Sequence, residues 1–286
     1  MWIVSIPVLI LIISLLTSSR ARLIYYRLKD DSVEWISERV YVIGGQRAGR
    51  EVRIVCLGDS MTDDMPEQPL VNRVLVCRPT WIQMLQSKLR ETCPNQRIFV
   101  FNYGARSTRI AAALERMTNP YKREDSYHET WVAQPSVKEM KPNIVILESH
   151  AYMDQDTKYE EYAQTVRQIL FLATKEMGAQ IYFLATICPD ATDYKKPYEL
   201  YINNPQKRIN EAQLIRSRME DFIALGKTLG VPTIDVYHET TMSPKQFIKG
   251  QDMVHPSYMG HILIAQKGFE AIRKSSAFNL ENIVKQ

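Results

Sequence analysis

The chain has 286 residues, 45% of them hydrophobic and 24% charged, with a formal net charge of +4. A chain of this length can bury a substantial core, and its composition excludes a disordered or fibrous protein. The mild positive charge does not by itself indicate a nucleic-acid partner, so charge says little about what the protein binds.

Residues 1–22 predict a transmembrane anchor. Trp2 to Leu16 are almost wholly apolar and the uncharged stretch continues to Arg20, close to the ~17–25 residues that span a bilayer. A cleaved signal peptide is the alternative, with Ser19-Arg20-Ala21 as a small-x-small cleavage site, although no Lys or Arg precedes the apolar core. A buried core helix fits less well, because the segment is apolar on every side.

Residues 23–50 are mixed in character and predict a linker with one short strand, Val40–Ile43. From residue 51 to 286 the pattern becomes regular and predicts one domain. Short apolar runs rich in β-branched and aromatic residues predict five strands. They lie at Ile54–Leu57, Ile98–Phe101, Ile144–Leu147, Ile181–Ala185 and Thr233–Val236.

Helical stripes lie between these runs, and alternation of this kind indicates βαβ units. We therefore expect an α/β fold: a three-layer α/β/α sandwich around a five-stranded parallel sheet. Five helices are expected. The first three are indicated by apolar stripes that start at Trp81, Ile110 and Tyr162, and the last two span Ile209–Leu229 and Gly260–Ile272. Thr118–Met140 is predicted to be a long loop or a small insertion beside the site, and Pro189–Pro205 a second long loop after the fourth strand. The basic residues at the start of the long fourth helix are interpreted as a solvated face: Lys207, Arg208, Arg216 and Arg218.

A serine follows the first predicted strand. The apolar run stops at Gly58, whose backbone freedom allows a sharp turn, and Asp59 and Ser60 come next. In open parallel sheets, ligands bind beyond the carboxyl ends of the strands. Ser60 is therefore a candidate nucleophile, provided that a general base can reach it.

Asp252 and His255 near the other end of the chain supply a candidate base. At a spacing of three on a helical turn the two side chains share a face, so the carboxylate can fix the tautomer of the imidazole. An Asp-x-x-His pair also occurs in proteins where it has no catalytic role.

A glycine, Gly104, follows the second predicted strand. Its backbone N–H, with that of Ser60, could form part of an oxyanion hole. A glycine required only by a tight turn is the competing interpretation.

These features together resemble the SGNH, or GDSL-type, hydrolase family over roughly residues 51–273. The shared features are Gly58-Asp59-Ser60, Gly104 and Asp252-x-x-His255, in the family's order. The resemblance implies a flavodoxin-like sandwich that hydrolyses carboxylic esters through an acyl-enzyme. It also implies that Ser60 is the nucleophile, that Asp252 and His255 complete the triad, that Ser60 and Gly104 donate to the oxyanion, and that no metal or organic cofactor is needed.

The chain departs from the family after the third strand. The usual Gly-x-Asn-Asp block is missing, and Ala151 or Tyr152 stands where its asparagine donor belongs. The Tyr152 hydroxyl or His150 could donate instead. Glu148, which ends the strand, and Arg106, which follows Gly104, are further candidates for contact with substrate.

The leading hypothesis is a membrane-anchored serine esterase that acts on carboxylic esters, such as acyl groups on a glycan or lipid. The alternative is a non-catalytic or acyltransferase-accessory domain that binds an acylated saccharide, which the missing asparagine favours. A phosphate or nucleotide binder that uses the Gly58 turn gives no role to Asp252 and His255. The positive charges after the apolar segment favour a cytoplasmic domain, whereas hydrolases with such anchors often work outside, so sidedness stays open.

Overall fold

The computed structural model describes residues 51–63, 70–71, 74–75, 79–125 and 130–278. The predicted anchor at 1–22 and the predicted linker at 23–50, with its strand Val40–Ile43, lie outside the described residues. In the described part of the chain, no helix combines the length and the hydropathy that crossing a bilayer requires.

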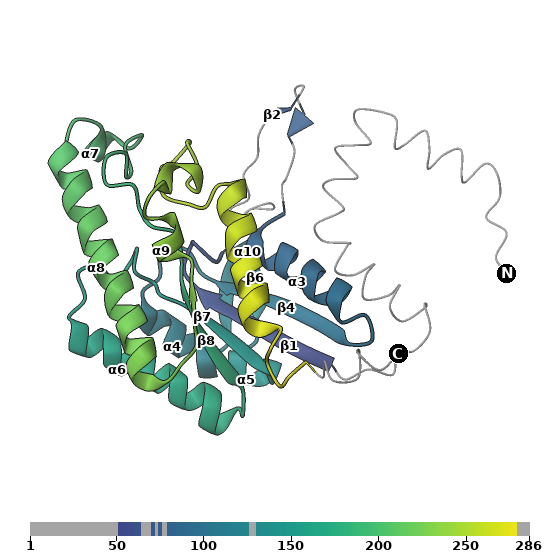
Figure 1. The fold of residues 1–286 in the computed structure, drawn as a ribbon. Coiled ribbons are helices and arrows are strands. Elements are labelled where there is room, and N and C mark those ends of the chain that lie inside the picture. The colour runs from purple at the N-terminus through teal and green to yellow at the C-terminus, as the bar shows by residue number, and fades with distance from the viewer. Residues whose placement is uncertain (1–50, 64–69, 72–73, 76–78, 126–129, 279–286) are drawn as a thin grey trace, which may run out of the picture. The chain divides into compact units, whose positions relative to one another are not determined.

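The core of the fold is a parallel sheet of five strands in the order β4-β1-β7-β8-β9 (Figure 1). All five predicted strands are confirmed. They are β1 (Glu51–Gly58), β4 (Arg97–Gly104), β7 (Ile144–Glu148), β8 (Gln180–Ala185) and β9 (Thr233–Asp235). In chain order this is the 2-1-3-4-5 arrangement of flavodoxin-like folds, whose ligand crevice opens between the first and third strands. The corresponding position here, where the order of the strands reverses, is between β1 and β7.

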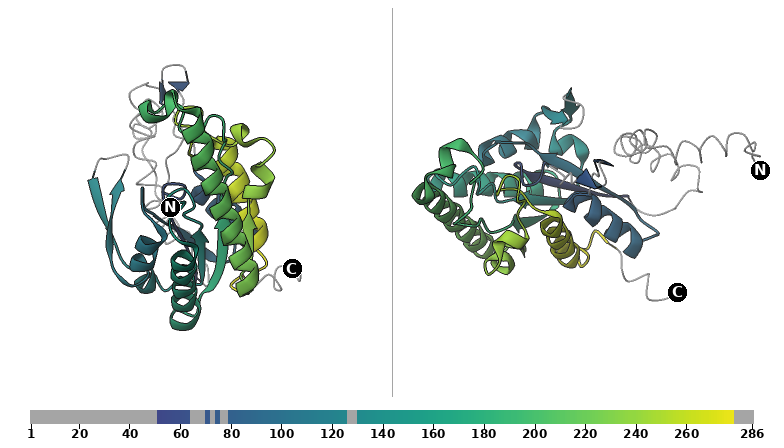
Figure 2. Two further views of the ribbon diagram at one scale, coloured as in Figure 1. Left: turned by 90° about the vertical axis from the view of Figure 1, so that its left-hand side faces the viewer. Right: turned by 90° about the horizontal axis from the view of Figure 1, so that it is seen from above.

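Side chains alternate between the two faces of the sheet, and helices cover both faces. Ile54, Ile146 and Leu184 belong to the same buried cluster as residues of α3 (Trp81–Thr92) and α10 (Tyr258–Ile272). Leu147 and Phe183 belong to the cluster on the other face, with α4 (Ile110–Thr118), α6 (Tyr159–Phe171) and α8 (Pro205–Leu229). The views in Figure 2 show helices on both sides of the sheet, which confirms the three-layer architecture.

Local capping sets the ends of the long helices. The helix expected from residue 209 begins earlier, at Pro205, because Asn204 Oδ1 accepts a hydrogen bond from Lys207 N at 3.0 Å. It ends at Gly230, whose φ of 66° is left-handed. Short helices fill the connections: α5 (Val137–Met140), α7 (Glu199–Ile202), α9 (Tyr237–Thr240), a π-helix at Leu172–Glu176 and a 3₁₀ turn at Pro244–Gln246.

Of the two predictions for Thr118–Met140, a long loop or a small insertion, the structure shows a small insertion. The segment contains an antiparallel hairpin, β5 (Tyr121–Asp125) with β6 (Thr130–Gln134), followed by α5. The strand β5 reads Tyr-Lys-Arg-Glu-Asp, so it offers no apolar alternation from which a strand could be predicted. A second hairpin pairs β2 (Leu70–Val71) with β3 (Val74–Leu75).

The solvated face predicted on α8 is wrong for two of its arginines. Arg208 and Arg218 are buried, and their guanidinium groups donate to loop carbonyl groups. Arg208 Nε lies 2.9 Å from Thr192 O and Arg218 Nε lies 3.1 Å from Asp154 O. The arginines satisfy backbone acceptors that the irregular loops leave without partners.

Candidate active site

Ser60 lies in a tight turn directly after β1. The carbonyl oxygen of Asp59 accepts hydrogen bonds from Thr62 N at 3.1 Å and Asp63 N at 2.9 Å, and Asp59 Oδ1 accepts one from Met61 N at 2.8 Å. Gly58 is required here, because a Cβ on it would lie 2.2 Å from Thr62 Oγ1. The turn folds back over the strand end and leaves Ser60 partly exposed at the sheet's carboxyl edge.

His255 and Asp252 are paired. His255 Nδ1 lies 2.9 Å from Asp252 Oδ2, and Asp252 Oδ1 accepts hydrogen bonds from the backbone N–H groups of Val254 and His255, each at 2.9 Å. Burial raises the pKa of Asp252, but the hydrogen bonds from His255 lower it more, so the net shift is downward. The carboxylate therefore holds the proton of the imidazole on Nδ1 and leaves Nε2 as a base.

The turn of Ser60 and the loop of His255 are joined through their neighbours. Met61 and Val254 belong to one buried cluster. The Trp81 indole Nε1 donates to Met61 O at 3.4 Å, while Trp81 N donates to Nδ1 of His261 in α10 at 3.2 Å. Burial raises the pKa of Asp59, the residue before Ser60, and interaction with His255 opposes that rise. The residues on both sides of Ser60, Asp59 and Met61, thus interact with the segment that carries the Asp252–His255 pair.

Gly104 ends β4 and pairs with Gly58 across the sheet. Its N–H donates to Asn102 Oδ1 at 2.9 Å. A Cβ on Gly104 would lie 2.3 Å from Asp63 N, so the position must be glycine for the Ser60 turn to lie against the end of β4. The close approach of the Asp63 backbone therefore explains why position 104 is a glycine. The Gly104 N–H already donates to an acceptor within the protein.

The three predicted contact residues after β7 are buried rather than open to a bound molecule. Glu148 accepts hydrogen bonds from Asp59 N and His150 N. The Tyr152 hydroxyl donates to Ile187 O at 2.9 Å. His150 Nδ1 lies 2.9 Å from Glu148 O, and burial lowers the pKa of His150 to about 3, so its ring is neutral.

Arginines from two segments bind the Ser60 turn. Arg106 Nε lies 2.9 Å from Asp63 Oδ2, so this predicted contact residue is half-buried in an ion pair. Arg116 of α4 is buried and donates to Gly58 O at 2.9 Å. Sequence reasoning missed Arg116, although a charged residue beside the apolar stripe that begins at Ile110 was a signal.

Two strand-end segments and the loop before α10 each present a buried nitrogen atom that has no hydrogen-bond partner in the described part of the chain. They are Asn102 Nδ2 before the end of β4, His150 Nε2 after β7, and His255 Nε2 before α10. Buried polar atoms without protein partners commonly mark positions for a ligand or water. Within the described ranges, no group of three or more His, Cys, Asp and Glu side chains is arranged to hold a metal ion.

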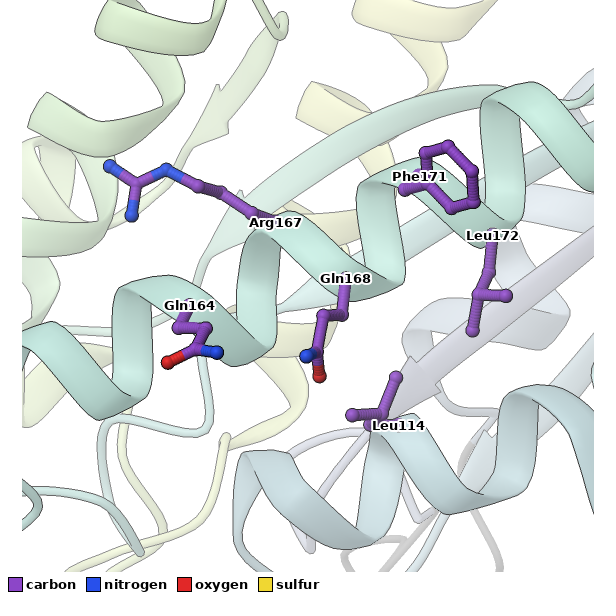
Figure 3. A pocket seen from close by; sticks show the side chains of 6 residues that line it. All are labelled: Leu114, Gln164, Arg167, Gln168, Phe171 and Leu172. Carbon is purple, nitrogen blue, oxygen red and sulfur yellow. The ribbon is translucent and has the colours of Figure 1, made fainter.

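A hollow of about 430 Å³ lies elsewhere, between α4 and α6. Figure 3 shows Gln168 and Leu172 pointing toward Leu114 across it. Its lining contains no nucleophile and no acidic or basic group other than the Arg167 guanidinium. It therefore offers no catalytic constellation, and the strand ends remain the candidate site.

Searches against protein-family models and curated proteins found no match. Solved structures do resemble the chain. A lipase/acylhydrolase from Enterococcus faecalis aligns at 17% identity with a TM-score of 0.52, over 78% of this chain and 95% of that one. The acetylxylan esterase Axe2 from Geobacillus stearothermophilus aligns at 16% identity with a TM-score of 0.52, over 79% and 96%. The acetyl xylan esterase AlAXEase aligns at 12% identity with a TM-score of 0.52, over 77% and 100%.

Three further Axe2 structures are described as catalytic mutants, in which a serine, an aspartate or a histidine is replaced by alanine. In Axe2 that aspartate precedes that histidine by three positions. At identities of 12–17% these likenesses show the fold, which is that of the esterases and acylhydrolases named above.

Proposed function

We propose that the protein is a serine hydrolase of carboxylic esters, with Ser60 as nucleophile, His255 as general base and Asp252 as the residue that orients the base. One observation carries the proposal. The Asp252–His255 pair holds an unpartnered, buried Nε2 in a loop that packs with the residues next to Ser60.

The proposed cycle has two halves. His255 Nε2 takes the Ser60 proton as the hydroxyl oxygen attacks the ester carbonyl, and the imidazolium then protonates the departing alcohol. Water, deprotonated by the same nitrogen, attacks the acyl-enzyme and releases the acid. Asp252 stays ionised throughout and stabilises the imidazolium, in agreement with its lowered pKa.

The weakest part of the proposed machinery is the oxyanion hole. The backbone N–H of Ser60 is the first proposed donor. The Gly104 N–H must be shared with Asn102 Oδ1, to which it already donates. Removal of one oxyanion donor costs about 10²–10³ in kcat, so we expect slower turnover than in an enzyme with a full set of donors.

The neighbours in fold support a glycan or lipid ester as substrate. Two of them are named acetylxylan esterases and one a lipase/acylhydrolase. The Asp-x-x-His spacing of the Axe2 catalytic mutants is also that of Asp252 and His255. We therefore propose acyl groups on a saccharide or lipid as the substrate class.

Hydrolysis of a short-chain aryl ester tests the proposal. Wild-type protein is expected to release the phenol in a burst that matches the enzyme concentration, because the acyl-enzyme forms before it is hydrolysed. Ser60→Ala should abolish both the burst and the steady state. Ser87→Ala, an exposed serine of α3, is the matched control and should retain both. A full burst in Ser60→Ala would remove Ser60 from its role.

A non-catalytic or acyltransferase-accessory domain that binds an acylated saccharide is the second candidate. The occupied Gly104 N–H and the absence of an asparagine after β7 favour it. Binding of an acetylated oligosaccharide with no release of acetate over many hours, and no loss of binding in Ser60→Ala, would support this candidate instead.

The N-terminal segment is proposed to anchor the protein in a membrane, with a cleaved signal peptide as the alternative. Support comes from its sequence alone. Expression of the full chain followed by membrane extraction and intact-mass measurement separates the two. An anchor leaves full-length protein that only detergent extracts, whereas a signal peptide leaves a shortened protein that needs no detergent.

A further inference from the structure

Asp59 and Glu148 are two buried carboxyl groups that meet where the order of the sheet reverses, between β1 and β7. They are 0% and 1% exposed. Glu148 Oε2 accepts a hydrogen bond from Asp59 N at 3.2 Å, which brings the two buried carboxyl groups close together, and the charges of the two groups interact. Two ionised carboxylates are acceptors only. A hydrogen bond between the two groups therefore requires a proton on one of them.

The hydrogen bonds indicate which residue carries the proton. Asp59 Oδ1 accepts from Met61 N, while Asp59 Oδ2 is buried and has no N–H or O–H donor among the described residues. Glu148 Oε1 already accepts from Ser149 Oγ at 2.9 Å and His150 N at 3.0 Å. A proton on Glu148 Oε2 would donate to Asp59 Oδ2 and leave every other bond in place. Burial raises the pKa of Asp59 to about 6 and raises that of Glu148 well above its usual range.

The two arginines near the pair face the aspartates. Arg116 interacts with the carboxyl groups of Asp59 and Asp63, and Arg106 binds Asp63. An ionised Glu148 would therefore add a buried negative charge beside Asp59 that these two guanidinium groups do not contact.

Other titratable groups face the pair from the neighbouring elements. Asp154 and His255 interact with Asp59, and so does Tyr194. Tyr152, from the turn after β7, and Tyr162, from α6, interact with Glu148. His150 lies beside Glu148 and is neutral. None of these groups supplies a cation against the Glu148 carboxyl, so a second negative charge there would have no direct partner.

We infer that Glu148 is a positioning residue of the site, which in its protonated form hydrogen-bonds to Asp59 and ties the turn of Ser60 to the turn after β7. This inference rests on the proposed function, because the nucleophile that Glu148 positions is Ser60. Glu148 also holds the backbone of His150, whose φ of 53° is left-handed and disfavoured for a side-chain-bearing residue. The Glu148 carboxyl group thus holds two turns: the tight turn at Asp59 and Ser60, and the turn after β7 that contains the left-handed His150.

Ionisation of Glu148 would place two negative charges side by side in the core, weaken the link and move the Ser60 turn. We therefore expect kcat to fall at alkaline pH as well as at acid pH, where the base is protonated. The sign for stability follows from proton binding: the folded protein keeps a proton that the unfolded chain releases above pH 4.5. The free energy of unfolding therefore decreases as pH rises from that value toward the folded pKa of Glu148.

Three variants test this inference. Glu148→Gln keeps the shape, and its amide can donate to Asp59 Oδ2 at every pH, although the amide nitrogen cannot accept the hydrogen bond from Asp59 N that Oε2 accepts. We therefore expect kcat within about tenfold of wild type and no alkaline decrease. Glu148→Ala removes the link altogether, so its kcat should be at least about tenfold lower than that of Glu148→Gln at every pH. Asp154→Asn removes another buried carboxyl, one that accepts from Ile110 N of α4. It should lower stability yet retain the alkaline decrease, because it does not touch the Glu148 link.

Infrared spectroscopy tests the proton without any substrate. Wild-type protein at pH 7 is expected to show the carbonyl stretch of a protonated carboxylic acid, which Glu148→Gln abolishes and Asp154→Asn retains. A wild-type spectrum without this band would overturn the inference whether or not the protein is an esterase, and so would an alkaline decrease that persists in Glu148→Gln. If Glu148→Gln does not fold, the wild-type protein alone still tests the inference. The inference predicts that the carbonyl band of the protonated acid disappears as the pH is raised, and a band that persists would contradict it. Failure of ester hydrolysis alone would contradict the proposed function and leave the band unaffected.

Discussion

Two Asp-x-x-His pairs lie wholly within the described residues, and they share their spacing and an Nδ1–carboxylate contact but differ in their surroundings. His255 Nδ1 lies 2.9 Å from Asp252, and His238 Nδ1 lies 2.6 Å from Asp235. His238 is half exposed, and its Nε2 lies 3.1 Å from Glu220. His255 is mostly buried, and its Nε2 has no partner in the described part of the chain.

The difference shows that spacing makes an Asp–His pair and that the surroundings decide what it can do. Both ring nitrogens of His238 contact carboxylates, which favours the charged ring. The hydrogen bond that His238 Nδ1 donates to Asp235 raises the pKa of His238 above its ordinary value. A ring held in this way has no free lone pair to accept a proton. The ring of His255 is held at one nitrogen only, beside the turn of a serine.

Replacing each histidine gives the largest contrast. His255→Ala should lower kcat/KM for an aryl ester by about 10⁴-fold or more, because the base is lost. His238→Ala should leave it within about twofold, because surface substitutions away from a site have small effects. Steady-state kinetics of both variants measure the contrast. Equal losses would contradict the claim that the surroundings of the two pairs decide their roles.

Replacing each aspartate tests the tautomer. Asp252→Asn should lower kcat by about 10⁴-fold, since the amide can hold the imidazole in the wrong tautomer. Asp235→Asn is the matched control and should retain wild-type kcat. Asp252 has a lowered pKa, so its stabilising contribution exists above the unfolded value of 3.8 and disappears as pH falls through the folded value. Chemical unfolding of Asp252→Asn should thus differ from wild type at pH 7 and match it at strongly acid pH.

Moving the serine turn while leaving both pairs intact sharpens the comparison further. Gly104→Ala places a Cβ 2.3 Å from Asp63 N, and relief of such overpacking costs about 1–3 kcal/mol. Ester turnover should fall while the Asp252–His255 contact stays. Gly268→Ala, in the middle of α10, meets only Leu85 at 3.7 Å, and should raise stability by about 0.5–1 kcal/mol because it removes a helix glycine. Denaturant titration compares the two, and an unaffected Gly104→Ala protein would contradict the close approach.

The smallest effect is the pH-dependent stability of the exposed pair. Because the folded pKa of His238 is raised, its contribution is fully present below the unfolded value of 6.5 and is lost as pH rises through the folded value. His238→Gln should therefore unfold at slightly lower denaturant than wild type at pH 5.5 and at the same concentration at pH 9. Solvent screens this half-exposed pair, so the difference should not exceed about 0.5 kcal/mol. A larger difference at pH 9 than at pH 5.5 would reverse the assigned sign.

The parts of the fold that the sequence predicted are those with a strong apolar signal. The five strands are short unbroken apolar runs, and the helices between them have apolar residues along one face. The order of the elements, and from it the parallel sheet, could therefore be predicted. The β5–β6 hairpin was missed because backbone pairing holds a strand whose side chains are mostly charged. Arg208 and Arg218 were misassigned because a buried arginine and a solvated one look alike until the loop carbonyl groups that they bind are placed.

The candidate site shows the same limit. Sequence order alone suggested the serine and the Asp–His pair, because their residue types and spacing are unusual together. It gave no sign that Glu148 would be buried against Asp59, since the two are 89 positions apart and meet only through the β1–β7 register. It also could not show that the Gly104 N–H would be occupied by Asn102, because that contact depends on a rotamer.

The most direct measurement maps the adduct of a fluorophosphonate probe by peptide mass spectrometry in wild type, His255→Ala and His238→Ala. The account predicts one adduct, on the peptide carrying Ser60, that forms at wild-type rate in His238→Ala and is lost in His255→Ala. An adduct on another residue, or one on Ser60 that forms equally fast without His255, would contradict the claim that these two residues act together.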